Sequence, residues 1–241
     1  MPAYTEGTKA ACRGALAEIA RILRASGIDY RVIGGSAILA ILESSPRPEA
    51  AAMYVGTQDV DIAAADSATR DALKRLLLDA GARPDPDDLD RVWLTVTVRR
   101  EVVEAPIDVL TSSLLTTVPG RSAVSSDLPV LATPALLLAK MRPYQNKQEK
   151  GKDGYDVYML LAYAELSPEA IAEQCARELP PDLTAELLTL VEVFFLAKRR
   201  ATRDAAAMLR DYHGITKSSA VRDVINVAER FARTLQSLLE A

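Results

Sequence analysis

The chain has 241 residues, of which 49% are hydrophobic and 26% are charged, enough apolar material for one large domain or two small ones. Its formal net charge of -4 argues against a general polyanion binder, although a local basic face stays open. Two distant cysteines and a single histidine argue against a disulfide scaffold or a thiolate zinc site. Since the sequence shows neither a bilayer-spanning apolar run nor a signal-peptide segment, we expect a cytoplasmic protein.

The first part of the chain predicts a helix, a strand and a second helix. Residues 8–26 carry apolar side chains at three- and four-residue spacing, which is typical of an amphipathic helix. Residues 30–33 predict a short strand, which Gly34 and Gly35 interrupt. A helix is then expected to open at Ser36.

More β-rich segments follow. Residues 60–65 predict a second strand, followed by a helix with Ser67 as its N-cap and Gly81 as its end. Residues 91–98 alternate with a period of two and are expected to pair with residues 102–110 as a hairpin.

The second part of the chain differs in composition. A short edge strand is expected over residues 128–131, and helical patterns dominate from Pro134 onward. The sequence therefore predicts an α+β fold: a mixed sheet with flanking helices in residues 1–132, followed by an all-α helical domain in residues 133–241.

Three carboxylates are candidates for a metal site. Asp59 and Asp61 are two residues apart, and alternate side chains of a strand share one face. Two carboxylates held together repel unless a cation lies between them, and a pair of Mg²⁺ ions about 3.5–4 Å apart would relieve that repulsion. Asp108 can join them if its strand neighbours theirs. The alternative is that all three are ordinary acids at strand edges.

The Gly34-Gly35-Ser36 turn is a candidate phosphate site. Glycines let the backbone approach a phosphate closely, and the start of a helix presents free N–H groups. The Ser36 hydroxyl could donate to the same phosphate. A tight strand-to-helix turn, with Ser36 as a simple N-cap, is the alternative. The turn is neither a dinucleotide-binding fingerprint nor a P-loop.

Basic residues gather in two places. Lys140 follows an apolar run, so its stem is expected to be partly buried and its ammonium could reach a triphosphate. Lys152 and Asp156 lie one helical turn apart and could merely form a surface pair. A second basic cluster comprises Lys198, Arg199, Arg200 and Arg203. It either faces solvent or helps hold a polyanionic acceptor.

The order of these motifs resembles the polymerase-β-type nucleotidyltransferase superfamily over residues 30–161. The resemblance rests on Gly-Gly-Ser opening a helix, on Asp59 and Asp61, and on Asp108 in a following strand. The segments around Lys140 and over residues 152–156 are most similar to the AbiEii/MenT-like toxin nucleotidyltransferases. The resemblance implies transfer of a nucleoside monophosphate from an NTP such as ATP, with two Mg²⁺ or Mn²⁺ ions and release of pyrophosphate. For toxin-type members it implies the 3′ end of tRNA as acceptor and an antitoxin protein as partner.

The resemblance also implies roles for individual residues. Gly34, Gly35 and Ser36 would hold the β- and γ-phosphates. Asp59 and Asp61 would bind both metal ions, and Asp108 would complete the second metal site and accept the proton of the attacking hydroxyl. Lys140 and Lys152 would contact the nucleotide, and Asp153 would act as a functional acid. Asp156 would orient that acid or pair with Lys152.

Two other functions stay open on the sequence. The same chemistry could act on a small molecule such as an aminoglycoside, or on a protein. A nucleotide-binding module without turnover would carry the same motifs.

Overall fold

The computed structural model describes residues 6–118, 121–122, 128–146, 148 and 151–241. Its contacts divide the chain into two compact units. The first unit consists of Met1–Ser44 and Val55–Leu131, and the second of Ser45–Tyr54 and Ala132–Ala241. A short segment from the first quarter of the chain therefore belongs to the second unit.

The first unit contains a mixed sheet of seven strands within the described residues, in the order β3-β4-β5-β2-β1-β7-β6. The strands are β1 (Arg31–Ile33), β2 (Val60–Ala64), β3 (Arg83–Pro84), β4 (Arg91–Val98), β5 (Glu101–Thr111), β6 (Arg121–Ser122) and β7 (Pro129–Val130). β2 runs parallel to β5 and β1 runs parallel to β7, whereas the other neighbours are antiparallel.

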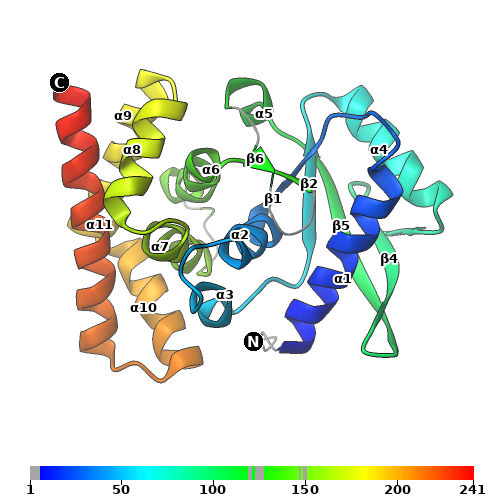
Figure 1. Ribbon diagram of the computed structural model, residues 1–241, viewed down its shortest axis with the longest axis horizontal. Coiled ribbons are helices and arrows are strands. Elements are labelled where there is room, and N and C mark those ends of the chain that lie inside the picture. The colour runs from blue at the N-terminus through cyan, green and yellow to red at the C-terminus, as the bar shows by residue number, and fades with distance from the viewer. Residues whose placement is uncertain (1–5, 119–120, 123–127, 147, 149–150) are drawn as a thin grey trace. The chain divides into compact units, whose positions relative to one another are not determined.

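The helices of this unit are α1 (Glu6–Leu23), α2 (Gly34–Glu43), α4 (Ser67–Asp79) and α5 (Leu114–Thr117). α1 and α4 contact each other and pack on β2, β4 and β5, while α2 packs against β1, β2 and β7 (Figure 1). The apolar stripe of α1 is buried through Ala15, Leu16, Ile19 and Leu23, which confirms the periodicity of the sequence.

The regular secondary structure described in the second unit is all helical. Its helices are α3 (Ala50–Met53), α6 (Thr133–Gln145), α7 (Asp153–Tyr163), α8 (Pro168–Glu178), α9 (Pro181–Val191), the π-helix η1 (Glu192–Ala197), α10 (Arg200–His213) and α11 (Lys217–Glu240). α7 and α10 approach closely at Gly154, where a Cβ atom would lie 2.5 Å from the carbonyl oxygen of Ala201. The predicted fold class, a mixed sheet with helices followed by a helical region, is confirmed.

Two local predictions were wrong. The N-cap of α4 is Asp66, whose side chain accepts a hydrogen bond from the Thr69 amide, and Ser67 is the first residue of the helix. β7 is not an edge strand, because it lies between β1 and β6. Among the described helices, none is both long enough and apolar enough to cross a lipid bilayer.

Candidate metal and nucleotide site

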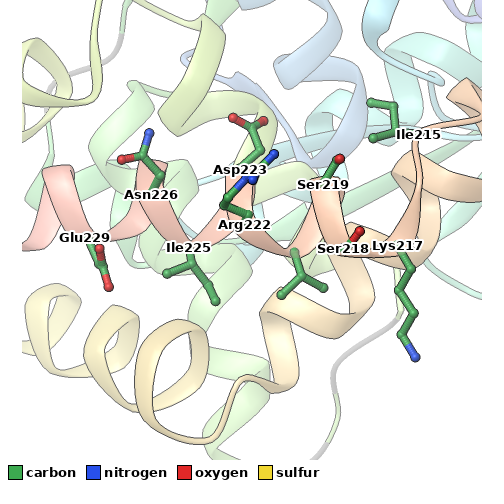
Figure 2. Close-up of a pocket in the computed structure, with 10 residues that line it drawn as sticks. Ile215, Lys217, Ser218, Ser219, Arg222, Asp223, Ile225, Asn226 and Glu229 are labelled. Atoms are coloured by element: carbon green, nitrogen blue, oxygen red, sulfur yellow. The ribbon is translucent and has the colours of Figure 1, made fainter.

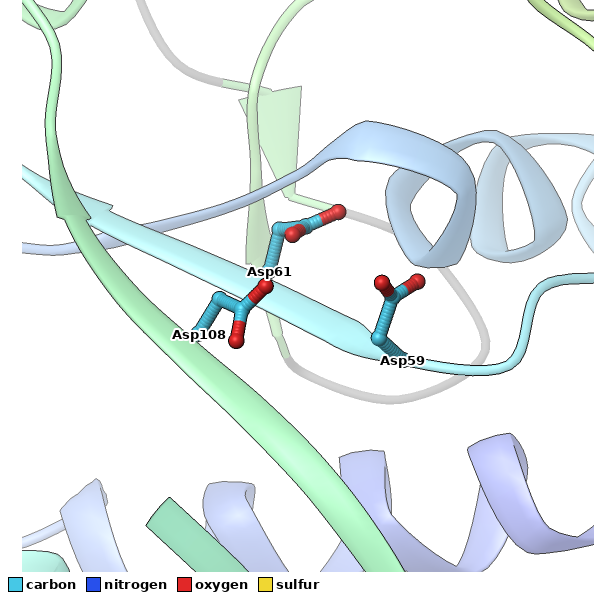
Figure 3. Close-up of side chains that lie close together, drawn as sticks. All are labelled: Asp59, Asp61 and Asp108. Atoms are coloured by element: carbon cyan, nitrogen blue, oxygen red, sulfur yellow. The ribbon is translucent and has the colours of Figure 1, made fainter. Parts of the chain in front are cut away.

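Three carboxylates converge on one side of the sheet in the first unit. Asp59 directly precedes β2, Asp61 lies within β2, and Asp108 lies within β5. The parallel pairing of β2 with β5 sets Asp61 opposite Asp108. One ligand oxygen from each residue lies within 4.8 Å of the other two, as Figure 3 shows. We call these three residues the acidic triad.

Strand alternation explains why the triad faces one way. The flanking residues Val60 and Ile62 of β2 are buried, as are Ile107 and Val109 of β5. Since successive side chains of a strand point to opposite faces, these apolar neighbours direct the carboxylates between them to the other face. The triad residues are each partly buried. The convergence suggested by the sequence is therefore present in the structure.

Two residues that the sequence analysis missed hold the triad in place. The Thr57 hydroxyl donates to Asp59 Oδ1 at 2.8 Å, and Thr57 is buried. Arg91 of β4 donates to both oxygens of Asp108, at 2.6 and 2.9 Å. This hydrogen-bonded ion pair raises the pKa of Arg91, against the opposing effect of its partial burial. Asp108 therefore has a counter-cation within the protein.

The glycine turn lies against the triad. Gly34 begins α2 with a φ of +64°, a backbone conformation that residues other than glycine rarely adopt. A Cβ atom on Gly34 would lie 1.9 Å from Asp61 Oδ2, so the position has no room for a side chain. The glycine turn and the acidic triad are therefore packed directly against each other.

The Ser36 hydroxyl is engaged inside the turn. Ser36 is fully buried, and its Oγ donates to the Ile33 carbonyl at 3.0 Å. The Asp61 amide donates to the same Oγ at 3.4 Å. These bonds connect α2 to β1 and β2, which is a structural role. The contact of Ser36 with a phosphate stays a prediction.

The donor set of the triad fits a hard divalent cation. All three residues offer carboxylate oxygens, the ligands that Mg²⁺ and Mn²⁺ prefer. Counting Arg91, the group carries a formal charge of -2, which a divalent ion would neutralise. The residues able to hold such an ion are Asp59, Asp61 and Asp108.

A second polar cluster lies in the second unit, between α6 and α7. Lys140 donates to Asp153 Oδ1 at 2.8 Å, and its Nζ lies 2.9 Å from Asp156 Oδ2. Lys152 forms an ion pair with Asp156 and donates to the Tyr54 hydroxyl at 2.6 Å. Tyr54 in turn donates to Asp156 at 2.9 Å. The two predicted lysines and the predicted acid Asp153 are thus brought together.

Burial and charge oppose each other in this cluster. Burial pushes the pKa of Lys140 down, but Asp156 and Asp153 outweigh it and the pKa is raised. Burial dominates at Lys152, whose pKa is lowered despite Asp156. Burial alone would raise the pKa of Asp156, yet the two lysines lower it. The alternative of a mere surface pair between Lys152 and Asp156 is excluded, because the Asp156 side chain is fully buried.

Similarity to known proteins lies at the level of structure. Neither a protein-family model nor a curated protein sequence matches the chain. A "putative nucleotidyltransferase" from H. pylori superposes with a TM-score of 0.56 at 11% identity, covering 97% of this chain and 98% of that chain. The fold is nucleotidyltransferase-like. JHP933 from Helicobacter pylori superposes on this chain with a TM-score of 0.53 at 10% identity, covering 97% of this chain and 95% of that chain.

A nucleotidyltransferase-like protein from Paracoccidioides brasiliensis aligns over 91% of this chain and 94% of that chain at 16% identity, with a TM-score of 0.41. At these identities the similarity shows the fold alone. The nucleotidyltransferase-like fold and the acidic triad are two separate observations. The first comes from the course of the backbone and the second from three side chains.

Proposed function

We propose that the protein is a metal-dependent nucleotidyltransferase that moves a nucleoside monophosphate from an NTP to an acceptor. The observation that carries the proposal is the acidic triad beside the Gly34 turn of a nucleotidyltransferase-like fold. A triphosphate needs cations to neutralise its charge and open space for its phosphate groups. The carboxylates would hold the cations, and the glycines of the turn leave the space open.

The reaction forms a bond between an acceptor hydroxyl oxygen and the α-phosphorus, and breaks the bond to the bridging oxygen of the leaving pyrophosphate. Asp59, Asp61 and Asp108 hold Mg²⁺ or Mn²⁺, which when bound supplies charge neutralisation at the phosphates. Asp108 accepts the proton of the attacking hydroxyl. Gly34, Gly35 and Ser36 position the β- and γ-phosphates through the start of α2.

We assign nucleotide contacts in the second unit to Lys140 and Lys152, with Asp153 as the functional acid. Support comes from the cluster itself, since the raised pKa of Lys140 keeps it cationic at neutral pH. A fixed cation neutralises charge that develops on a triphosphate. The assignment of these roles otherwise rests on the resemblance of residues 140–156.

We propose the 3′ end of tRNA as the acceptor and a toxin role, with an antitoxin protein as partner. The basic cluster of Lys198, Arg199, Arg200 and Arg203 supports an RNA acceptor, because phosphates bind cations. The toxin role and its antitoxin rest on the resemblance alone.

The test is a transfer assay with each of the four α-³²P-labelled NTPs, Mg²⁺ or Mn²⁺, and total tRNA. Label should enter RNA, and Asp61→Asn should abolish transfer because it removes a metal ligand while keeping the size of the side chain. The matched control is Asp79→Asn, which removes one charge from the exposed surface of α4. Parallel incubations with aminoglycosides and with protein acceptors test the other acceptors. Absence of label under every condition, or equal transfer by Asp61→Asn, would contradict the proposal.

A further inference from the structure

Charge is unevenly distributed in the second unit. The unit has 16 Lys or Arg residues and 16 Asp or Glu residues, so its formal charge is zero. Residues 198–222, which run through α10 into α11, contain seven of the basic residues and only two of the acidic ones. This segment therefore carries +5, while the rest of the unit carries -5. Such segregation produces a local positive potential in a protein that is acidic overall.

The two acids of this segment do little to neutralise it. Asp204 accepts a hydrogen bond from the Tyr144 hydroxyl at 2.8 Å, and burial raises its pKa. Asp211 forms an ion pair with its neighbour Arg210 at 2.7 Å. Both carboxylates are therefore already engaged, one of them by a neutral donor.

Most of the basic residues keep their charge available to solvent. Five of them are exposed and have no carboxylate within ion-pair distance among the residues that the structure describes: Lys198, Arg199, Arg203, Lys217 and Arg222. The Nζ of Lys198 lies over the ring of Phe194, 5.4 Å from the ring centroid. Solvated surface cations usually alternate with anions, so an uncompensated group of five favours an anionic ligand.

Three cations share one pocket between α10 and α11. Arg203, Arg210 and Lys217 line a hollow of about 180 Å³ together with Ala206, Ala207 and Val221. Small-molecule sites usually have about 300–1,000 Å³, so this hollow is too small for a whole nucleotide. It suits a single phosphate group of a longer polymer. The small alanines leave the cations unobstructed.

A larger open hollow continues along α11. It has a volume of about 1330 Å³ and shares Lys217 and Val221 with the small pocket. Its polar lining includes Ser218, Ser219 and Asn226 together with two carboxylates, Asp223 and Glu229 (Figure 2). Hydroxyl and amide side chains of this kind donate to phosphate and sugar oxygens.

We infer that residues 198–222 form a surface that binds the phosphate backbone of RNA. Five of the seven cations are arginine, which binds phosphate through paired N–H groups. An acidic protein partner is disfavoured, because the described large apolar side chains that are exposed all lie outside this segment. The inference deepens the proposed function by locating the binding of its acceptor class, and its test needs neither NTP nor metal.

The test measures binding of a short fluorescein-labelled RNA and of tRNA by anisotropy over a range of KCl concentrations, in EDTA. The variant combines Arg203→Gln, Arg210→Gln and Lys217→Gln. Each lost phosphate contact removes roughly 0.7–0.9 from the slope of log K against log[salt], so the slope should fall by about 2. We expect affinity to fall at least tenfold while the melting temperature stays unchanged.

The matched control removes three exposed arginines elsewhere: Arg24→Gln, Arg177→Gln and Arg233→Gln. It should bind RNA as the wild type does. Equal weakening in the control would reduce the effect to net charge and overturn the inference. Displacement of RNA by polyglutamate at equal charge concentration would point to an acidic protein instead. If the binding pattern holds while transfer is absent, the surface stands and the proposed enzyme fails.

Discussion

The ion pair between Arg91 and Asp108 gives a sharp test of the acidic triad. Arg91→Gln removes the cation and keeps most of the side-chain length. Asp108 would then face Asp59 and Asp61 without its counter-charge, and the formal charge of the group would change from -2 to -3. A bound divalent ion would take over the role of Arg91. The variant should therefore be destabilised without metal and largely rescued by metal.

The size of the effect follows from the geometry. The interaction that the variant loses is the ion pair of Arg91 with Asp108, whose two hydrogen bonds measure 2.6 and 2.9 Å. A hydrogen bond to a charged group contributes about 1.5–3 kcal/mol. Because Arg91 and Asp108 keep side-chain exposures of 29% and 17%, the lower part of this range applies. The metal-free variant should thus lose about 2 kcal/mol, which corresponds to roughly 4–8 °C in melting temperature for a chain of this length.

The assay compares melting temperatures of wild type and Arg91→Gln in EDTA and in saturating Mn²⁺, with Mn²⁺ affinity from calorimetry. Mn²⁺ should raise the melting temperature of the variant more than that of the wild type. Arg83→Gln is the matched control, since Arg83 pairs with Glu104 on the same sheet. Its small loss should not depend on metal. An equal loss for Arg91→Gln with and without Mn²⁺ would refute the reasoning and make the ion pair purely structural.

Three further predictions concern backbone strain and acid stability. Gly34→Ala should lower the unfolding free energy by about 1–2 kcal/mol, because a residue with a side chain is strained in the left-handed conformation. It should also abolish Mn²⁺ binding in calorimetry, because its Cβ would displace a triad carboxylate, and wild-type Mn²⁺ affinity would contradict this. Arg99 and Arg100 both have positive φ in the β4–β5 turn. Arg99→Asn with Arg100→Gly should therefore raise the free energy of unfolding by about 1 kcal/mol in urea denaturation, and an unchanged urea midpoint would argue against strain. Hydrogen bonds from Arg230 lower the pKa of Glu169 from 4.5 to about 2, so this stabilisation is complete above pH 4.5 and is lost as the pH falls through about 2. Glu169→Gln should reduce the loss of unfolding free energy at low pH by less than about 1 kcal/mol, because the pair of Glu169 with Arg230 is exposed. An unchanged dependence of the unfolding free energy on pH in this range would exclude this contribution.

The sheet and its triad were predictable because strand alternation is a local property. The apolar neighbours of Asp61 and Asp108 specify which face each carboxylate takes, whatever the rest of the chain does. The parallel pairing of β2 with β5 joins segments far apart in the chain. The convergence of Asp108 with the other two carboxylates was therefore predicted only on the condition that their strands are neighbours. The structure supplies it through the register that sets these two residues opposite each other.

Arg91 could have been found from the sequence. A two-residue turn at positions 99–100 pairs each residue of β4 with a fixed partner in β5, so Val98 faces Glu101 and Arg91 faces Asp108. Opposite charges at facing positions then indicate a cross-strand ion pair. The hairpin was predicted, but the register of its two strands was not counted. Thr57 carried no comparable signal, because its contact depends on an irregular segment before β2.

The second cluster was harder to predict because its partners come from distant segments. Tyr54 lies about a hundred residues before Asp156, and only the membership of Ser45–Tyr54 in the second unit brings them together. The short polar spacing of Lys152 and Asp156 suggested an exposed helix surface. Burial of α7 reverses that interpretation, since every residue of this helix from Asp153 to Ala162 is buried.

Charge balance separates the two clusters. The acidic triad with Arg91 keeps an uncompensated charge of -2, so it gains from an added cation. Lys140, Lys152, Asp153 and Asp156 sum to zero, so an added phosphate must displace a carboxylate that already binds a lysine. Asp156 is fully buried and bound by two lysines and Tyr54, which makes its displacement costly. Asp153 is also buried, but its side chain is 7% exposed against 0% for Asp156. We therefore expect Asp153 to be the carboxylate that exchanges with a phosphate, and Asp156 to hold the lysines in position.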